Sequence, residues 1–280
     1  MFRLVLCLSL GLALSRSSAA QQRPLVTEDP ETVGAGRVLV EGGIDYARNQ
    51  QYPATGLEGT LWRLPRIGFS IGVSSIAEIQ LDGGPFNRLS ITKRERAPLS
   101  DSLLFTGATT HDVEDFVMGA KIRIMAESAR RPAFGFRFAT RLPNASIQQG
   151  IGTDTTDFFA SILASKTVQS VRIVGNIGLG ILGDPTNGHR QNDVLTYGGS
   201  FARALTNHSE VVGEVNGRVS TRSGSAFPGT ETRGTLNLGG RHTRGAVRFD
   251  VGMLFGLTTV DPTIGFTTGI TYVFHAFDVP

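Results

Sequence analysis

The sequence predicts an all-β fold, a transmembrane antiparallel up-and-down β-barrel of about twelve strands, on the basis of three observations. A short apolar stretch at the N-terminus has the pattern of a secretory signal peptide. Long segments after it alternate between apolar and polar residues with the two-residue period of a β-strand. The links between these segments are alternately short and long, which is typical of barrels in the bacterial outer membrane.

Residues 1–20 are expected to form a signal peptide that is cleaved after Ala20. Arg3 supplies the positive charge before an apolar run from Leu4 to Leu14, and Ser18-Ala19-Ala20 provides the small residues that cleavage needs. The apolar run is too short for a membrane-spanning helix, which takes about 20 residues. The mature chain is therefore expected to be exported.

The composition excludes several classes of protein. The only cysteine is Cys7, inside the apolar run, so a mature chain would form no disulfide and no thiolate metal site. Removal of Arg3 and Arg16 leaves the mature chain close to neutral, which gives no indication of a nucleic-acid partner. After the signal peptide no apolar run reaches the length of a membrane helix, and the 35 glycines argue against a long helical protein.

Alternation is clearest in the last predicted strand, where the apolar side chains between Ile264 and Phe274 share one face. These segments reach about ten residues, which is longer than the usual globular strand of about five or six and enough to cross a bilayer. A soluble β-sandwich would show the same alternation without needing strands of this length. The predicted strands span residues 36–48, 55–70, 75–83, 112–125, 132–142, 155–166, 169–182, 192–205, 209–222, 230–242, 245–257 and 263–274.

The links supply an independent argument for the barrel. Thr167-Val168, Thr206-Asn207-His208 and Thr243-Arg244 are short, whereas Gly84 to His111 and Pro143 to Asp154 are long. Outer-membrane barrels have short periplasmic turns and longer outer loops. This rhythm favours a barrel with both termini in the periplasm.

The barrel is expected over residues 37–274, between two shorter segments. Residues 21–36, which we call the leader, are polar and contain two prolines. A plug at the periplasmic mouth is one interpretation of this segment, and a flexible periplasmic leader is the interpretation that the composition favours. Tyr272 and Phe274 are expected to be the aromatic signal for the barrel-assembly machinery, and a short tail, residues 275–280, follows them.

Several short segments resemble a family of outer-membrane barrels labelled "MetA-pathway of phenol degradation", whose members are described as transporter-like. The resemblance implies a barrel for small-molecule passage, with aromatic compounds as the solutes, and it brings no catalytic residues. The segments that carry it are Thr27-Glu28-Asp29-Pro30-Glu31-Thr32, Gly34-Ala35-Gly36, Val38 to Tyr46, Asp115, Gly119-Ala120-Lys121-Ile122-Arg123, Leu142-Pro143-Asn144 and Gly150-Ile151-Gly152-Thr153-Asp154.

The polar faces of the strands predict a lumen with more basic than acidic residues. A charged residue facing lipid costs about 2–4 kcal/mol at the bilayer midplane, so these side chains are expected to point inward. An open lumen of this kind would favour anions. The alternative is a ladder of ion pairs that fills the lumen and only stabilises it. The predicted lumen-lining residues are Glu41, Asp45, Asp115, Lys121, Arg123, Arg137, Arg141, Arg172, Glu214, Arg218, Arg233, Arg241, Arg248 and Asp250.

Other candidate sites are weaker. The basic run Lys93-Arg94-Glu95-Arg96 could fold inward as a constriction or bind lipopolysaccharide phosphates, although such runs are usually solvated loops. The five histidines show no motif of a catalytic Ser–His pair. The composition of a loop explains the polar cluster from Asp184 to Asn192 as well as a metal site would. We therefore expect no enzyme activity, no metal and no cofactor.

The sequence thus predicts a passive channel or small-molecule transporter for aromatic or anionic compounds in the outer membrane of a Gram-negative bacterium. Its expected partners are outer-membrane lipids and lipopolysaccharide, the barrel-assembly machinery and a small-molecule solute, with no nucleic acid. One alternative is a structural or adhesive barrel with a filled lumen that acts through its outer loops. The other is an outer-membrane lipid hydrolase.

Overall fold

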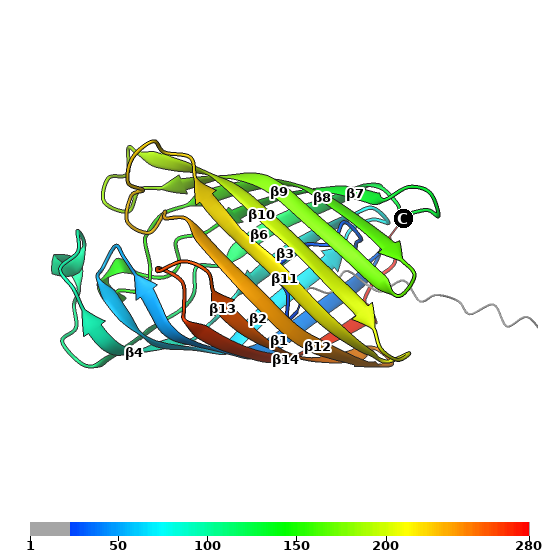
Figure 1. Ribbon diagram of the computed structural model, residues 1–280, viewed down its shortest axis with the longest axis horizontal. Helices are drawn as coiled ribbons and strands as arrows, with labels where there is room; N and C mark the ends of the chain where they lie inside the picture. The colour runs from blue at the N-terminus through cyan, green and yellow to red at the C-terminus, as the bar shows by residue number, and fades with distance from the viewer. Residues whose placement is uncertain (1–22, 280) are drawn as a thin grey trace, which may run out of the picture.

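The alternating segments form long strands, and the computed structural model, which describes residues 23–279, closes them into an antiparallel β-barrel (Figure 1). The expected signal peptide lies outside the described residues. Among those residues, no helix is long and apolar enough to cross a membrane. The strand segments are β1 (Arg37–Tyr52), β2 (Leu57–Gly72), β3 (Ala77–Gly83), β4 (Asn87–Arg94), β5 (Thr109–Asp112), β6 (Val117–Met125), β7 (Ala133–Arg141), β8 (Asp157–Val168), β9 (Val171–Gly183), β10 (Gln191–Ala204), β11 (Ser209–Ser220), β12 (Arg233–Arg244), β13 (Val247–Gly256) and β14 (Ile264–His275), with two 3-10 turns, η1 (Ser100–Ser102) and η2 (Ile147–Gln149).

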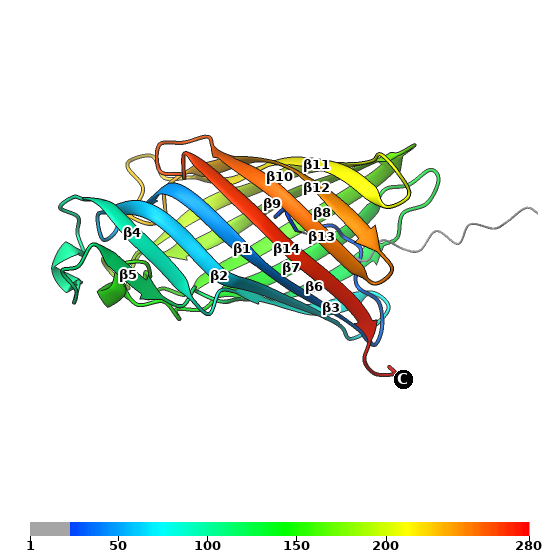
Figure 2. The ribbon, with the colours of Figure 1, turned by 90° about the horizontal axis from the view of Figure 1, so that it is seen from below.

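Fourteen segments make twelve strands because two strands of the wall are interrupted. One half of β2 pairs with β3 and the other half with β4, so β3 and β4 act as one bent strand. β6 pairs with β3, and β5 pairs with β4, so β5 and β6 together act as the next strand. β1 closes the barrel because it pairs with both β14 and β2 (Figure 2). The predicted twelve-stranded barrel is therefore confirmed.

The predicted long link from Gly84 to His111 was wrong, because it contains β4 and β5. These short strands extend the hairpin beyond the rest of the wall (Figure 1). Serine, threonine and charged residues occupy much of β4 and β5, so the apolar–polar alternation is limited to a short stretch around Leu89 and Ile91. Pro65 is tolerated in β2 because it lies where the strand changes partner: pairing with β4 ends at Arg63 and pairing with β3 begins at Ile67.

The outer surface of the wall is apolar. Phe138, Ile177 and Val251 lie on different strands and are 48%, 56% and 47% exposed. A contiguous surface of this kind is unfavourable in water and matches a lipid bilayer. The polar residues between these positions point inward, so the alternation has the phase of a membrane barrel rather than of a soluble sandwich.

The two ends of the barrel differ. Links 73–76, 126–132, 169–170, 205–208 and 245–246 lie at one end, where β1 begins opposite the end of β14. We call this the short-link end. The opposite, long-link end carries links 95–108, 142–156, 184–190 and 221–232, together with the turn between β1 and β2.

Candidate functional site

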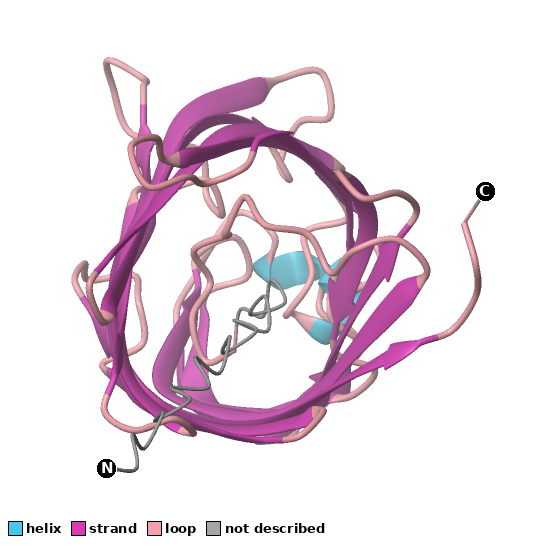
Figure 3. Cartoon of the chain, turned by 90° about the vertical axis from the view of Figure 1, so that its right-hand side faces the viewer, coloured by secondary structure: helices cyan, strands magenta, loops and turns pink. Residues whose placement is uncertain are grey.

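The lumen is the candidate site, and the leader occupies its part nearest the short-link end. Residues 23–36 pass inside the ring of strands rather than extending away from it (Figures 2 and 3). Arg23 contacts Asp45 and Asp250 on the wall, and its carbonyl oxygen accepts a hydrogen bond from Arg241 at 2.8 Å. The flexible periplasmic leader that the composition favoured is therefore corrected to a plug within the lumen.

Carboxylates of the leader neutralise basic residues of the wall. Glu28 lies 2.9 Å from the Arg137 guanidinium and 3.4 Å from the Lys121 ammonium group. Asp29 pairs through both oxygens with Arg172, and Glu31 pairs with Arg123. Acids from the leader thus neutralise part of the excess of basic residues on the wall.

Polar side chains of the wall also hold the backbone of the leader. The Glu214 carboxylate accepts hydrogen bonds from the amides of Val26 and Thr27 at 2.8 Å. Asn176 accepts from the Glu28 amide and donates to the Glu28 carbonyl, both at 2.7 Å. Because backbone groups are bound as well as side chains, the path of the leader is specified and not only its charge.

Glycines in the wall let the leader approach closely. A Cβ atom on Gly43 would lie 2.3 Å from the Arg23 guanidinium, and one on Gly198 would lie 2.9 Å from the Thr27 hydroxyl. A larger residue at either position would need the leader to move. The shape of the wall therefore complements the leader in the same way as its charges do.

The structure places all of the predicted lumen-lining residues on the inner face. Those in contact with the leader are Asp45, Lys121, Arg123, Arg137, Arg172, Glu214, Arg241 and Asp250. The others interact within the wall and its links: Glu41 with Thr271, Asp115 with the Ala145 amide, Arg141 with Asp157, Arg218 with the carbonyls of Gly229 and Glu231, Arg233 with the Gln51 carbonyl and Arg248 with Thr243.

Sequence reasoning missed several inner residues. Glu78 and Gln80 on β3 are each 1% exposed, and Glu78 accepts a hydrogen bond from the Val33 amide of the leader at 2.7 Å. Their alternation with Ile79 and Leu81 could have identified them. The signal for the leader acids was the shortage of acidic residues on the predicted inner face, since a nearby acidic segment could supply the missing negative charge.

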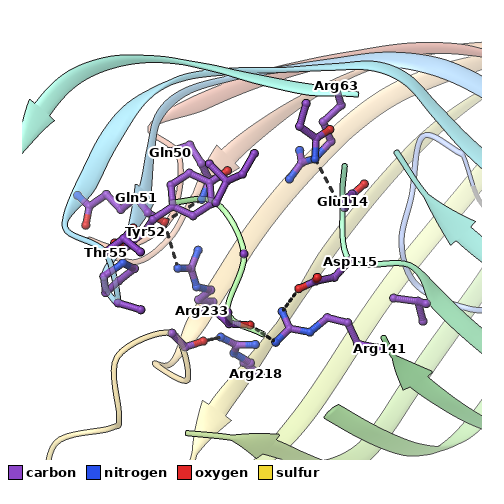
Figure 4. A pocket seen from close by; sticks show the side chains of 18 residues that line it. Gln50, Gln51, Tyr52, Thr55, Arg63, Glu114, Asp115, Arg141, Arg218 and Arg233 are labelled. Carbon is purple, nitrogen blue, oxygen red and sulfur yellow. Dashed lines mark hydrogen bonds and ion pairs between the residues drawn. The ribbon is translucent and has the colours of Figure 1, made fainter. Parts of the chain in front are cut away.

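Among the cavities lined by residues 23–279, two lie in the lumen toward the long-link end. The first, about 310 Å³, is lined by the turn between β1 and β2, by residues 151–153 and by Arg63, Arg141, Arg218 and Arg233 (Figure 4). The second, about 380 Å³, is lined by residues 26–28 of the leader and also by Arg218 and Arg233. These two arginines therefore stand where the cavities adjoin.

The inward-folded segment at the long-link end is not the predicted basic run. Lys93, Arg94 and Arg96 are exposed on the β4–β5 hairpin, and Arg94 stacks on the Phe105 ring at 4.8 Å. The link between β7 and β8 folds inward instead, tied by a 2.7 Å hydrogen bond from the Thr55 hydroxyl to the Gly150 carbonyl. The predicted constriction by residues 93–96 is corrected accordingly.

A carboxylate at the short-link rim is held in its charged form. Burial acts to raise the pKa of Glu127, but hydrogen bonds from Thr167 and Lys166, together with the positive charge of Arg172, outweigh this and lower it. A lowered folded-state pKa stabilises the protein above the ordinary glutamate pKa, and this stabilisation is lost as the pH falls through the folded-state value. The rim contact between Glu127 and Arg172, at 3.0 Å, is therefore in place at neutral pH.

Tyr272 and Phe274 lie on β14 with their rings stacked at 5.5 Å, and residues 275–279 continue past them. Their role as an assembly signal stays a prediction.

No protein-family model matches the chain, and no curated protein is similar to it in sequence. Among solved structures, the NanC porin has a TM-score of 0.50 at 6% identity, over 84% of this chain and 98% of that porin. The translocator domain of the autotransporter NalP from Neisseria meningitidis gives 0.45 at 13% identity, over 85% and 88% of the two chains. The toluene transporter TodX from Pseudomonas putida gives 0.40 at 10% identity, over 89% and 92%. The similarity to NanC shows the fold of an outer-membrane barrel.

Proposed function

We propose that the protein is an outer-membrane channel for small solutes that its own leader holds closed. The apolar outer wall and the closed ring of strands support the membrane location. The observation that carries the proposal is that the leader fills one part of the lumen and cavities occupy another part. A cavity of about 380 Å³ borders residues 26–28 of the leader, a second of about 310 Å³ lies at the long-link end, and polar contacts with Glu214 and Asn176 hold the backbone of the leader.

The proposal includes an orientation. With both ends of the barrel in the periplasm, the long links would face the outside and the leader would close the periplasmic half. Cleavage after Ala20 would leave a new N-terminus close to Arg23, the first described residue, which contacts Asp45 and Asp250 inside the lumen. Solute would enter the cavities from the outside and pass once the leader has moved.

A structural barrel is the second candidate, because ion pairs between leader and wall also suit a permanently filled lumen. Lys121, Glu78 and Glu28 form a buried cluster of this type. In this case the outer loops would carry the function. The two candidates differ in one measurable property, the passage of solute when the leader is absent.

Deletion of residues 21–31 is expected to convert a poorly permeable barrel into a permeable one. The deletion removes the acids of the leader and the amides that bind Glu214 and Asn176, but it keeps residues 32–36, where Val33 packs on Leu39 and Val273. The measurement is the swelling rate of liposomes that contain either barrel, with neutral sugars of increasing size. Heat-modifiable migration on gels would show that both barrels are folded. A folded deletion variant that stays as impermeable as the intact barrel would contradict a channel and support the structural candidate.

A further inference from the structure

We infer that Arg218 and Arg233 form a binding site for a small organic carboxylate at the junction of the two lumen cavities. This inference rests on the proposed function, because it names the class of solute that would use the path. Arg218 projects from β11 and Arg233 from β12, and both residues line both cavities. A bound anion would therefore lie between the outer mouth and residues 26–28 of the leader.

Arg218 is held in place by neutral groups. Its Nε and Nη2 donate to the carbonyl oxygens of Glu231 and Gly229 at 2.9 and 2.8 Å, both in the link between β11 and β12. These bonds orient the guanidinium without neutralising it. Arg233 makes a single, longer hydrogen bond of 3.5 Å to the Gln51 carbonyl. Donor groups of both guanidiniums are therefore left for a ligand.

The neighbouring arginines have carboxylate partners, and Arg218 and Arg233 have none in the described part of the chain. Arg63 lies 3.2 Å from the Glu114 carboxylate, and Arg141 pairs with Asp157. Within residues 23–279, no carboxylate lies within 4.0 Å of either Arg218 or Arg233. Elsewhere in the lumen, Arg123, Arg137 and Arg172 pair with carboxylates of the leader.

Arg141, Arg218 and Arg233 point into the same part of the first cavity (Figure 4). Glu114 and Asp115 also line this cavity, but their carboxylates lie beside Arg63 and Arg141, at 3.2 and 3.9 Å, and not within 4.0 Å of Arg218 or Arg233. Cations that share a site of reduced polarity repel one another, and an anion placed among them relieves that repulsion. The planar fork of a guanidinium matches the two oxygens of a carboxylate. A volume of about 310 Å³ is in the range of small-molecule sites and limits the ligand to a compact anion.

The experiment titrates the purified, folded barrel in detergent with butyrate by isothermal calorimetry, with butanol as the neutral analogue. We expect saturable butyrate binding that weakens about tenfold or more in Arg218→Gln and in Arg233→Gln, because each loses a charge-assisted donor. Arg203→Gln is the matched control. Arg203 is exposed near the short-link end of β10, and its replacement is expected to leave the affinity unchanged. Arg218→Lys, which keeps the charge without the planar fork, is expected to bind severalfold more weakly and serves if a glutamine variant does not fold.

Absent or unsaturable butyrate binding, or equal affinity in the intact and Arg218→Gln barrels, would overturn the inference. Equal binding of chloride or inorganic phosphate would also overturn it, because it would show attraction of any anion. Liposome swelling with neutral sugars, run on the same preparations, separates this result from the proposed function. A barrel that passes sugars after deletion of residues 21–31 but binds no butyrate would keep the channel and lose the carboxylate site.

Discussion

Replacement of Gly198 by leucine is expected to open the barrel without changing any charge. The three atoms nearest to a Cβ atom at this position, at 2.9 to 3.5 Å, all belong to the Thr27 side chain, so a larger residue is expected to displace the leader before the wall. Overpacking of this kind costs about 1–3 kcal/mol, which would shift an equilibrium between bound and released leader by about 5- to 150-fold. Conductance in planar bilayers, as the fraction of time that the channel is open, measures the shift.

The neighbouring glycine provides the matched control. A Cβ atom on Gly199 would meet nothing within 4 Å, and this residue lies on the opposite face of β10. Gly199→Leu is therefore expected to conduct like the unmodified barrel. A folded Gly198→Leu barrel whose open fraction equals that of Gly199→Leu would show that the leader does not control conduction.

Replacement of Lys121 by methionine is expected to cause a large loss of stability. The Lys121 side chain is fully buried, and its ammonium group lies 2.9 Å from Glu78 and 3.4 Å from Glu28. Methionine would leave the buried Glu78 carboxylate without its cation and would leave Glu28 paired with Arg137, and removal of one partner of a buried ion pair costs about 3–5 kcal/mol. Equilibrium unfolding in urea, with the barrel in lipid vesicles, measures the change in free energy of unfolding.

Lys166 serves as the comparison for this prediction. It pairs with Glu127 at 3.2 Å, but it lies at the short-link rim, and its side chain is 30% exposed. Rim ion pairs contribute about 1 kcal/mol or less, so Lys166→Met is expected to have a small effect. Equal losses in the two variants would mean that the buried cluster around Lys121 is not a main support of the leader.

Most of the barrel could be predicted from the sequence because the alternation of apolar and polar residues shows, within each strand, which side chains face lipid and which face the lumen. The alternation from Ile264 to Phe274 fixes which side chains meet lipid, and a barrel is the arrangement in which every such strand finds two neighbours. The extensions β4 and β5 could not be predicted in this way. They lie beyond the rest of the wall, and only a few of their side chains, such as the fully buried Leu89, join an apolar cluster, so no regular alternation runs along them.

For the lumen site, the sequence predicted the residues of the wall but not the leader that contacts them. Alternation placed Lys121, Arg137 and Arg172 on the inner face, but it could not tell what fills the space opposite them. That depends on contacts between residues far apart in the chain, such as the 143 positions between Asp29 and Arg172. A short polar segment with two prolines resembles a flexible terminus when it is considered alone. Its order comes from the complementary surface of the wall.

The most direct test of the closed channel is a reversible lock on the leader. A Cβ atom on Gly198 would lie 3.5 Å from the Thr27 Cβ, a separation that a disulfide can bridge, and the chain after the expected signal peptide contains no other cysteine. The measurement is solute flux through the Thr27→Cys/Gly198→Cys barrel before and after reduction. We predict no flux through the oxidised barrel and, through the reduced one, at least the low flux of the unmodified barrel, because only in the reduced barrel can the leader be released. Equal flux in the two states would contradict a channel that the leader closes.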